Sequence, residues 1–137
     1  MLEGKRILIV DDAFDVQQLM TFFISKAGAD VTCANHGQEG LDCFEKAEAD
    51  GAPFDLILLD QQMPVMDGPT MARELRNRGK ELPIIAVSAF TSPECRILAR
   101  EAGCNAFVAK PFQRQNLVEM VSLGLTKDSE LQHTFNE

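Results

Sequence analysis

Residues 54–60, Phe54-Asp55-Leu56-Ile57-Leu58-Leu59-Asp60, form the stretch that decides the fold of this chain. Four large aliphatic residues follow one another, and a carboxylate comes directly after them. A short apolar run of this kind, set off by the turn at residues 51–53, is typical of a strand covered on both faces. Such strands belong to the parallel sheets of α/β proteins, where ligands sit beyond the carboxyl ends of the strands. The stretch therefore predicts a buried strand that presents Asp60 at a ligand-binding edge.

Two further apolar runs end in a similar way. Residues 7–10 are followed by Asp11 and Asp12, and residues 106–109 are followed by Lys110. Because the carboxyl ends of parallel strands share one edge, we expect the three aspartates and the lysine to converge there. Three carboxylates in one small site repel each other and do not all stay ionised unaided. A hard cation such as Mg2+ offsets this charge and leaves the lysine to meet an anion.

Strand and helix patterns alternate five times along the chain. The predicted strands span residues 6–10, 31–34, 54–59 and 84–88, with a fifth that ends at Lys110. The first predicted helix ends near Ala27, and the second begins at a capping box formed by Asn35 and Gln38. The third has Pro69 in its first turn, and the fourth has Ser92 as its N-cap before Pro93. The fifth spans residues 113–123. The first helix is expected to bury Val16, Leu19, Met20 and Phe23. The alternation predicts one α/β domain whose parallel sheet carries helices on both faces.

Composition excludes several classes of function. With 137 residues, 45% of them hydrophobic, the chain suits one domain with a substantial core. Its formal net charge of -8 argues against nucleic-acid binding and against direct contact with an anionic membrane. Phosphate-binding loops of the GxGxxG or GxxxxGK type do not occur in the sequence. The four cysteines, Cys33, Cys43, Cys95 and Cys104, form no CxxC pair, so we expect buried free thiols and a reducing, cytoplasmic compartment.

Together these residues resemble the receiver domain of two-component response regulators. The resemblance rests on Asp11-Asp12, Asp60, Met63-Pro64-Val65-Met66-Asp67-Gly68, Ser88-Ala89 and Lys110-Pro111-Phe112. It covers roughly residues 5–125, so we expect a receiver domain at 1–125 and a polar tail or linker at 126–137. The resemblance implies a flavodoxin-like (βα)5 fold, which is a doubly wound parallel five-stranded sheet with strand order 2-1-3-4-5.

The resemblance also assigns a role to each residue at the predicted edge. Asp60 is the implied phosphoacceptor, which receives the phosphoryl group from a phosphohistidine on a histidine kinase or a histidine phosphotransfer protein. The implied Mg2+ ligands are Asp11, Asp12, Asp60 and the backbone carbonyl of Gln62. Lys110 and the hydroxyl of Ser88 are expected to bind the remaining phosphoryl oxygens.

Other residues are implied to control switching and rate. Ser88 and Phe107 form the implied switch, with Phe107 moving inward as Ser88 engages phosphate. This change would alter the face made by the fourth helix, fifth strand and fifth helix, where a second copy or an effector binds. Gln62 and Phe90 flank the path of attacking water; Phe90 obstructs it or Gln62 orients it, and the sequence leaves both open. Pro64, Asp67, Gly68 and Pro111 are expected to be structural, with a cis Lys110–Pro111 bond.

Two alternative functions stay open at the level of sequence. A Mg2+-dependent aspartyl-phosphate phosphatase needs a second aspartate two residues after the nucleophile, where this chain has Gln62. A degenerate receiver that only binds partners is disfavoured by the complete set of site residues. We expect self-phosphorylation and autodephosphorylation without turnover of an external substrate. Residues 4–8 and 63–68 are similar to receivers of hybrid sensor histidine kinases, which favours such a kinase as the parent protein over a stand-alone receiver. A parent of this kind could be anchored in a membrane.

Overall fold

Strands and helices alternate along residues 1–126, the part of the chain that the computed structural model describes. The strands are β1 (Arg6–Val10), β2 (Asp30–Ala34), β3 (Leu56–Asp60), β4 (Ile84–Ser88) and β5 (Ala106–Ala109). The helices are α1 (Phe14–Lys26), α2 (Gly37–Ala49), α3 (Gly68–Asn77), α4 (Pro93–Ala102) and α5 (Arg114–Gly124). The five predicted strands are therefore confirmed, but some bounds differ. The third strand spans Leu56–Asp60 rather than 54–59, the second begins at Asp30, and the fifth ends at Ala109 rather than at Lys110.

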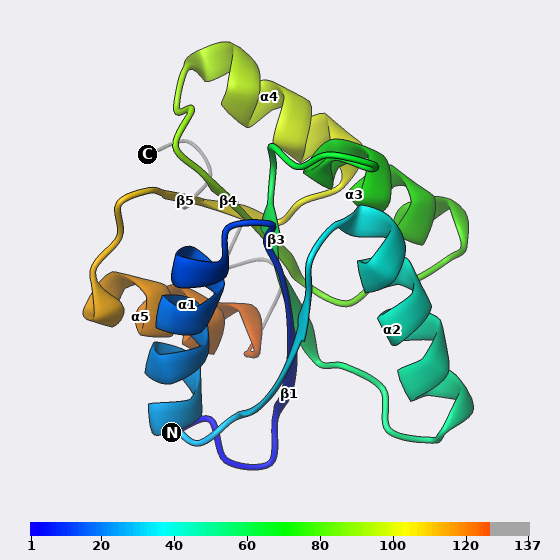
Figure 1. The fold of residues 1–137 in the computed structure, drawn as a ribbon, viewed down its shortest axis with the longest axis vertical. Coiled ribbons are helices and arrows are strands. Elements are labelled where there is room, and N and C mark those ends of the chain that lie inside the picture. The colour runs from blue at the N-terminus through cyan, green and yellow to red at the C-terminus, as the bar shows by residue number, and fades with distance from the viewer. Residues whose placement is uncertain (127–137) are drawn as a thin grey trace.

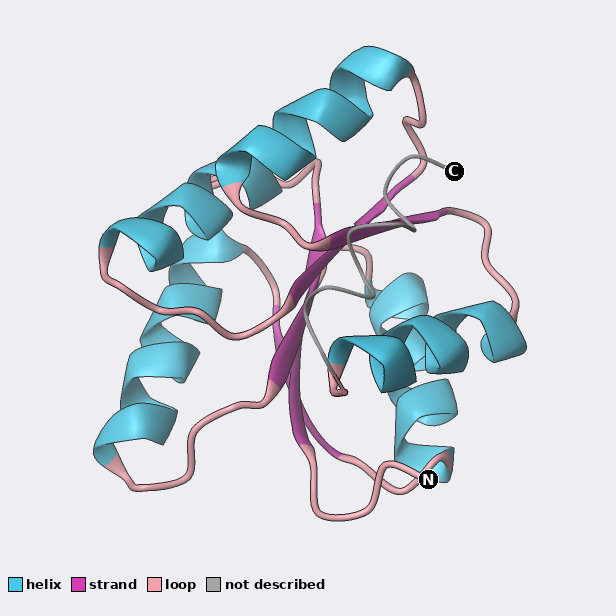
Figure 2. Cartoon of the chain, turned by 180° about the vertical axis from the view of Figure 1, so that it is seen from behind, coloured by secondary structure: helices cyan, strands magenta, loops and turns pink. Residues whose placement is uncertain are grey.

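The five strands form one parallel sheet in the order β2-β1-β3-β4-β5. Helices α1 and α5 cover one face, and α2, α3 and α4 cover the other, as Figures 1 and 2 show from opposite sides. This is the flavodoxin-like arrangement that the resemblance implies. The order reverses between β1 and β3, so the chain leaves these two neighbouring strands in opposite directions and opens a crevice at their carboxyl ends.

Two layers of apolar side chains hold the sheet between its helices. Strands β1, β3 and β4 are almost wholly buried, which explains their continuous aliphatic sequences. On one face, Met20 of α1 and Leu117 of α5 are fully buried against the sheet. On the other face, Phe44 of α2 and Leu75 of α3 do the same. Because each helix buries its apolar stripe against the sheet, the strand ends that carry the polar residues are held in place.

Local signals at the helix ends are partly confirmed. Asp67 accepts a hydrogen bond from Thr70 N–H and caps α3, and Ser92 caps α4 through Cys95 N–H. The predicted cap of α2 was wrong by one residue, because His36 Nδ1 accepts the hydrogen bond from the backbone of Glu39. His36 therefore has a structural role that its sequence position did not reveal.

The buried stripe of α1 also differs from the prediction. Leu19 is 44% exposed, whereas Gln17 is buried beside Met20 and Ile24. The amide of Gln17 donates to the backbone carbonyls of Asp11 and Ala34, so its polar group is satisfied inside the fold. Compared with the prediction, the buried face of α1 is consequently turned so that Gln17, rather than Leu19, faces the ends of β1 and β2.

The remaining predictions concern cysteines, the tail and membranes. All four cysteines are free, but only Cys104 is buried and the other three are half-buried. Residues 127–137, which hold nearly all of the predicted tail, lie outside the described part of the chain. Each helix within residues 1–126 is too short or too polar to span a bilayer.

Candidate functional site

The register between β1 and β3 brings two of the predicted aspartates together. Val10 lies opposite Leu59 in this parallel pair, so the next residues, Asp11 and Asp60, are neighbours at the carboxyl edge. Both side chains are buried, with Asp11 0% and Asp60 3% exposed. Two buried carboxylates side by side repel each other, so this edge of the sheet carries an unbalanced negative charge.

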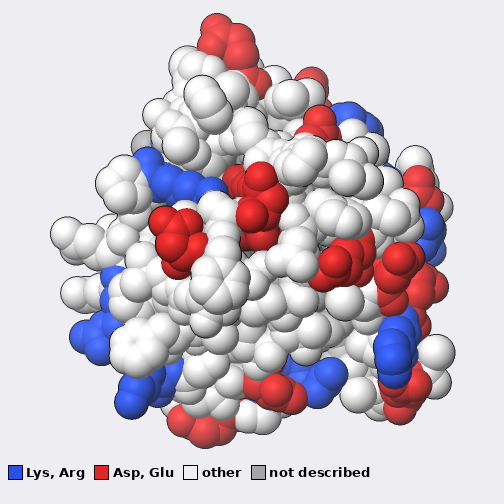
Figure 3. Space-filling view, viewed as in Figure 1, with Lys and Arg blue, Asp and Glu red and all other residues white. Residues whose placement is uncertain are grey.

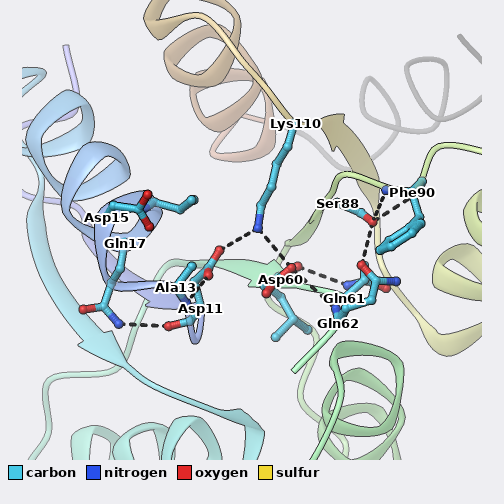
Figure 4. Close-up of polar contacts among 12 residues, drawn as sticks. Asp11, Ala13, Asp15, Gln17, Asp60, Gln61, Gln62, Ser88, Phe90 and Lys110 are labelled. Carbon is cyan, nitrogen blue, oxygen red and sulfur yellow. Dashed lines mark hydrogen bonds and ion pairs between the residues drawn. The ribbon is translucent and has the colours of Figure 1, made fainter. Parts of the chain in front are cut away.

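Lys110 reaches the same point from β5. Ser88 ends β4 opposite Ala109, and Lys110 is the next residue along. The Nζ of Lys110 lies 3.0 Å from Asp11 Oδ2 and 3.2 Å from Asp60 Oδ1, which Figure 4 shows as a bridge between the two carboxylates. Asp11, Asp60 and Lys110 therefore converge as predicted, and one cation faces two anions, which leaves a net negative charge. The Lys110–Pro111 peptide bond is cis, as the resemblance implied.

The electrostatics of this cluster favour a further positive charge. Burial and, to a smaller extent, the charge of Asp11 raise the pKa of Asp60 to about 6, and Lys110 only partly opposes them. Burial lowers the pKa of Lys110, but its hydrogen bond to Asp11 and the charges of Asp60 and Asp11 outweigh burial and raise it. Lys110 is therefore a firmly protonated cation, while Asp60 is an unusually weak acid.

A divalent cation fits the three aspartates. Asp11, Asp12 and Asp60 each offer a carboxylate oxygen, and these oxygens lie within 4.8 Å of one another. Asp12 is exposed, so water can complete the coordination shell that Mg2+ prefers. A set of carboxylate and water oxygens, without sulfur or imidazole ligands, is the donor set that a hard cation prefers.

The loop after Asp60 is held tightly against the site. Gly68 begins α3 so close to β3 that a Cβ there would lie 2.4 Å from the backbone oxygen of Asp60, which explains the glycine. Asp67 caps the same helix, and its carboxylate is outside the acidic cluster, in agreement with its predicted structural role. At the loop centre, Val65 has φ 71°, a left-handed conformation that is uncommon for a β-branched residue.

Ser88, Gln62 and Phe90 form a second polar group beside Asp60. The Ser88 hydroxyl donates to Gln62 Oε1 at 2.9 Å and accepts a hydrogen bond from Phe90 N–H at 3.0 Å. Phe90 and Gln62 are both exposed residues, and Figure 4 shows them next to Ser88. The two residues predicted to tune the rate thus lie directly next to Ser88.

Phe107, the predicted switch aromatic, is already covered in this conformation. Its side chain is 4% exposed and packs in the core beneath α4. The guanidinium carbon of Arg96 lies 4.5 Å from the ring centroid, and Arg96 Nε donates to the carbonyl of Thr91 in the β4–α4 loop. Arg96, which the sequence did not single out, therefore connects the loop after Ser88 to the aromatic ring.

Gln17 is a further site residue that the sequence analysis missed. Its Nε2 lies 3.0 Å from the carbonyl oxygen of Asp11 and 3.2 Å from that of Ala34. It therefore joins the ends of β1 and β2 directly beneath the acidic cluster (Figure 4). The available signal was a polar residue at helical spacing from Met20 and Ile24, on the face that points into the fold.

Charged side chains are distributed over the face of residues 1–126 that Figure 3 shows. On the side shown in Figure 3, acidic and basic side chains are interspersed, without one continuous basic patch. Several of the basic side chains pair with acids, such as Lys46 with Asp50 and Arg78 with Glu74. The net charge of -8 adds a long-range repulsion toward polyanions.

Comparison with known proteins agrees with the geometry. The sequence model for the response regulator receiver domain matches residues 7–122. A probable transcriptional regulatory protein of Picosynechococcus sp. is 33% identical over 115 residues, which are 82% of this chain and 46% of that protein. This chain thus spans less than half the length of that relative.

Solved structures show the same relationship. The chemotaxis protein CheY4 of Vibrio cholerae is 31% identical with a TM-score of 0.76, over 86% of this chain and 96% of that one. A putative response regulator from Chloroflexus aurantiacus is 32% identical with a TM-score of 0.83, over 91% of this chain and 100% of that one. The chain belongs to the receiver domains of two-component response regulators.

Proposed function

We propose that Asp60 is the phosphoacceptor of this receiver domain. The observation that carries the proposal is the position of its buried carboxylate, beside Asp11 and within 3.2 Å of the Lys110 ammonium group. A carboxylate held next to a fixed cation can attack phosphorus and form an aspartyl phosphate. The donor is a phosphohistidine on a histidine kinase or a histidine phosphotransfer protein, the partner class that receiver domains imply.

The transfer exchanges one bond to phosphorus for another. A carboxylate oxygen of Asp60 forms the new O–P bond while the N–P bond of the donor phosphohistidine breaks. The electron pair of that bond returns to the imidazole nitrogen, which takes up a proton from solvent. Lys110 is placed to leave Asp60 for a phosphoryl oxygen, so its charge follows the negative charge as it moves.

We further propose that Mg2+ is held by Asp11, Asp12, Asp60 and the backbone carbonyl of Gln62. The clustered oxygens and the raised pKa of Asp60 support this assignment. When bound, the cation offsets the charge between the carboxylates and the phosphoryl oxygens and so keeps Asp60 ionised. Gln17 and the hydrogen bond from Ala13 N–H to Asp11 Oδ1 hold the β1–α1 loop in place for it.

The output of the switch is proposed to be the face made by α4, β5 and α5. A cavity of about 430 Å³ opens there, lined by Phe107, Pro111, Asn116 and Met120 among others. Ser88 and Phe107 link this face to the site through β4 and β5. A second copy of the chain or an effector would bind it after phosphorylation.

The free cysteines support a reducing, cytoplasmic setting.

Intact-mass measurement tests the proposal. With Mg2+ and a small phosphodonor such as acetyl phosphate, the wild type should gain the mass of one phosphoryl group, and Asp60→Asn should gain none. Asp67→Asn is the matched control, because it changes an aspartate on the same loop to a residue that also caps helices. Equal labelling of the wild type and Asp60→Asn would exclude Asp60 as the acceptor.

A further inference from the structure

We propose that the Gln62 side chain is a latch that holds the Ser88 hydroxyl in the unphosphorylated protein and so opposes switching. This inference rests on the proposed function and adds a regulatory residue to it. In the proposed function Gln62 contributes its backbone carbonyl. The latch assigns a separate task to its side-chain amide, toward Ser88 rather than toward a cation or a water molecule.

The hydrogen bonds of Ser88 show why its hydroxyl is not free. The side chain is fully buried, and its Oγ lies 2.9 Å from Gln62 Oε1, the nearer of its two acceptors. The Phe90 carbonyl is a second acceptor at a longer distance of 3.2 Å. A hydroxyl has one proton and serves one acceptor well at a time. Ser88 can therefore donate to a phosphoryl oxygen only after it releases Gln62.

The latch lies directly beside the phosphoacceptor. Gln62 is two residues after Asp60, and its backbone N–H lies 3.5 Å from Asp60 Oδ1. Ser88 belongs to the adjacent strand, in which Val87 lies opposite Asp60. The bond between Gln62 and Ser88 consequently ties the β3–α3 loop to the end of β4, on the side of Asp60 away from Asp11 (Figure 4). Movement of Ser88 toward Asp60 has to break this tie.

The energetic consequence has a definite sign. A contact shifts a conformational equilibrium only if it differs between the two states, and this bond exists only in the unswitched state. Gln62 is exposed, so water satisfies its amide after release, and the buried Ser88 hydroxyl is then able to donate to a phosphoryl oxygen. Removing the latch should therefore favour the switched state roughly two- to tenfold, the range expected for one hydrogen bond.

A double-mutant cycle tests the latch. Gln62→Met keeps the length of the side chain but removes the acceptor oxygen. With Mg2+ present, it should lower the concentration of beryllofluoride, a phosphoryl mimic, that half-saturates the protein by roughly two- to tenfold. In a Ser88→Ala background, the same Gln62→Met change should have no effect, because the latch is already broken.

Two results would overturn the latch. One is equal affinity of the wild type and of Gln62→Met for beryllofluoride. The other is an equal increase in affinity from Gln62→Met in the wild-type and Ser88→Ala backgrounds, which would indicate that residue 62 contacts the mimic directly. Without any mimic, Gln62→Met should shift NMR signals of residues 88–92 in the wild-type background only, and unchanged signals would also refute the latch. If beryllofluoride fails to bind the wild type, the proposed function is contradicted, and these mimic-free spectra still decide on the latch.

Discussion

At the residue scale, Asp60 combines two requirements that oppose each other. It must be buried beside Asp11 and Lys110 to meet a phosphoryl group in a fixed geometry. The same burial, together with the charge of Asp11, raises its pKa to about 6, which means that the fold holds its charged form at a cost. The site residue is therefore a source of instability when no cation is bound.

The pH dependence of stability should show this cost. Because the folded pKa of Asp60 lies above its ordinary value of 3.8, the fold gains from its protonated form at low pH and loses that gain as pH rises through about 6. Asp60→Asn stays neutral throughout. Without Mg2+ we expect it to match the wild type near pH 4 and to exceed its free energy of unfolding by about 1–3 kcal/mol at pH 7.5.

Urea unfolding at the two pH values, with Mg2+ removed by a chelator, measures this difference. Equal stability of the two proteins at pH 7.5 would show that the carboxylate of Asp60 is not strained by its surroundings.

The sequence was sufficient to predict those site residues that are defined by their residue type and by their position at a strand end. Asp11, Asp60, Ser88 and Lys110 are placed by strand ends, and strand ends can be recognised in a sequence. The roles of Gln17 and Arg76 could not be predicted in this way. Arg76 looks like an exposed helical arginine, yet its guanidinium donates to the carbonyls of Gly103, Lys80 and Leu82. Gly103 lies in a distant segment that only the fold brings next to Arg76.

At the scale of elements, the link from β4 to α4 carries the proposed switch. Ser88 ends β4, the loop behind it contacts Arg96 of α4, and Arg96 covers Phe107 of β5. Because the ring is already buried, we expect its packing beneath Arg96 to change on phosphorylation more than its exposure. Ser88→Ala should still be phosphorylated at Asp60 but should transmit a smaller response.

NMR shift changes at Phe107 and in α4 on adding beryllofluoride measure that response. The changes should be clearly smaller in Ser88→Ala than in the wild type. Identical changes in both proteins would show that Ser88 does not couple the site to this face.

The boundaries of elements were predictable to different degrees. The strands β1 and β4 lie at the predicted residues because turn residues bound their uninterrupted aliphatic runs. The rotation of α1 was not predictable, since Leu19 and Gln17 both fit helical spacing and burial of an amide depends on backbone carbonyls from other strands. Likewise, only the fold shows that His36 rather than Asn35 caps α2.

At the scale of the whole molecule, a cation that binds only the folded state should stabilise it. A tenfold excess of Mg2+ over its Kd contributes about 1.4 kcal/mol by mass action, which corresponds to a rise of a few degrees in Tm. Asp12→Ala should abolish this rise, and Asp67→Asn should keep it. A thermal shift that is unchanged in Asp11→Ala, Asp12→Ala and Asp60→Asn would place the cation elsewhere.

The global arrangement needed more than periodicity. Alternating strand and helix patterns predict a parallel sheet with helices on both faces, and the structure confirms it. Those patterns do not determine which strands are neighbours, because several orders satisfy the same connection rules. The order β2-β1-β3-β4-β5 came from the resemblance carried by the site residues, and it is this order that places Asp11 beside Asp60.

The central claim is that the phosphoryl group is carried by Asp60, and locating the modified residue tests it most directly. Borohydride reduces an acyl phosphate to an alcohol and so converts a phosphorylated aspartate to homoserine. After phosphorylation with Mg2+ and a small phosphodonor, peptide mass spectrometry should find homoserine at position 60 and intact aspartate at Asp11 and Asp12. Homoserine at either of those positions, or unmodified Asp60 in a protein that carries the phosphoryl mass, would contradict the account.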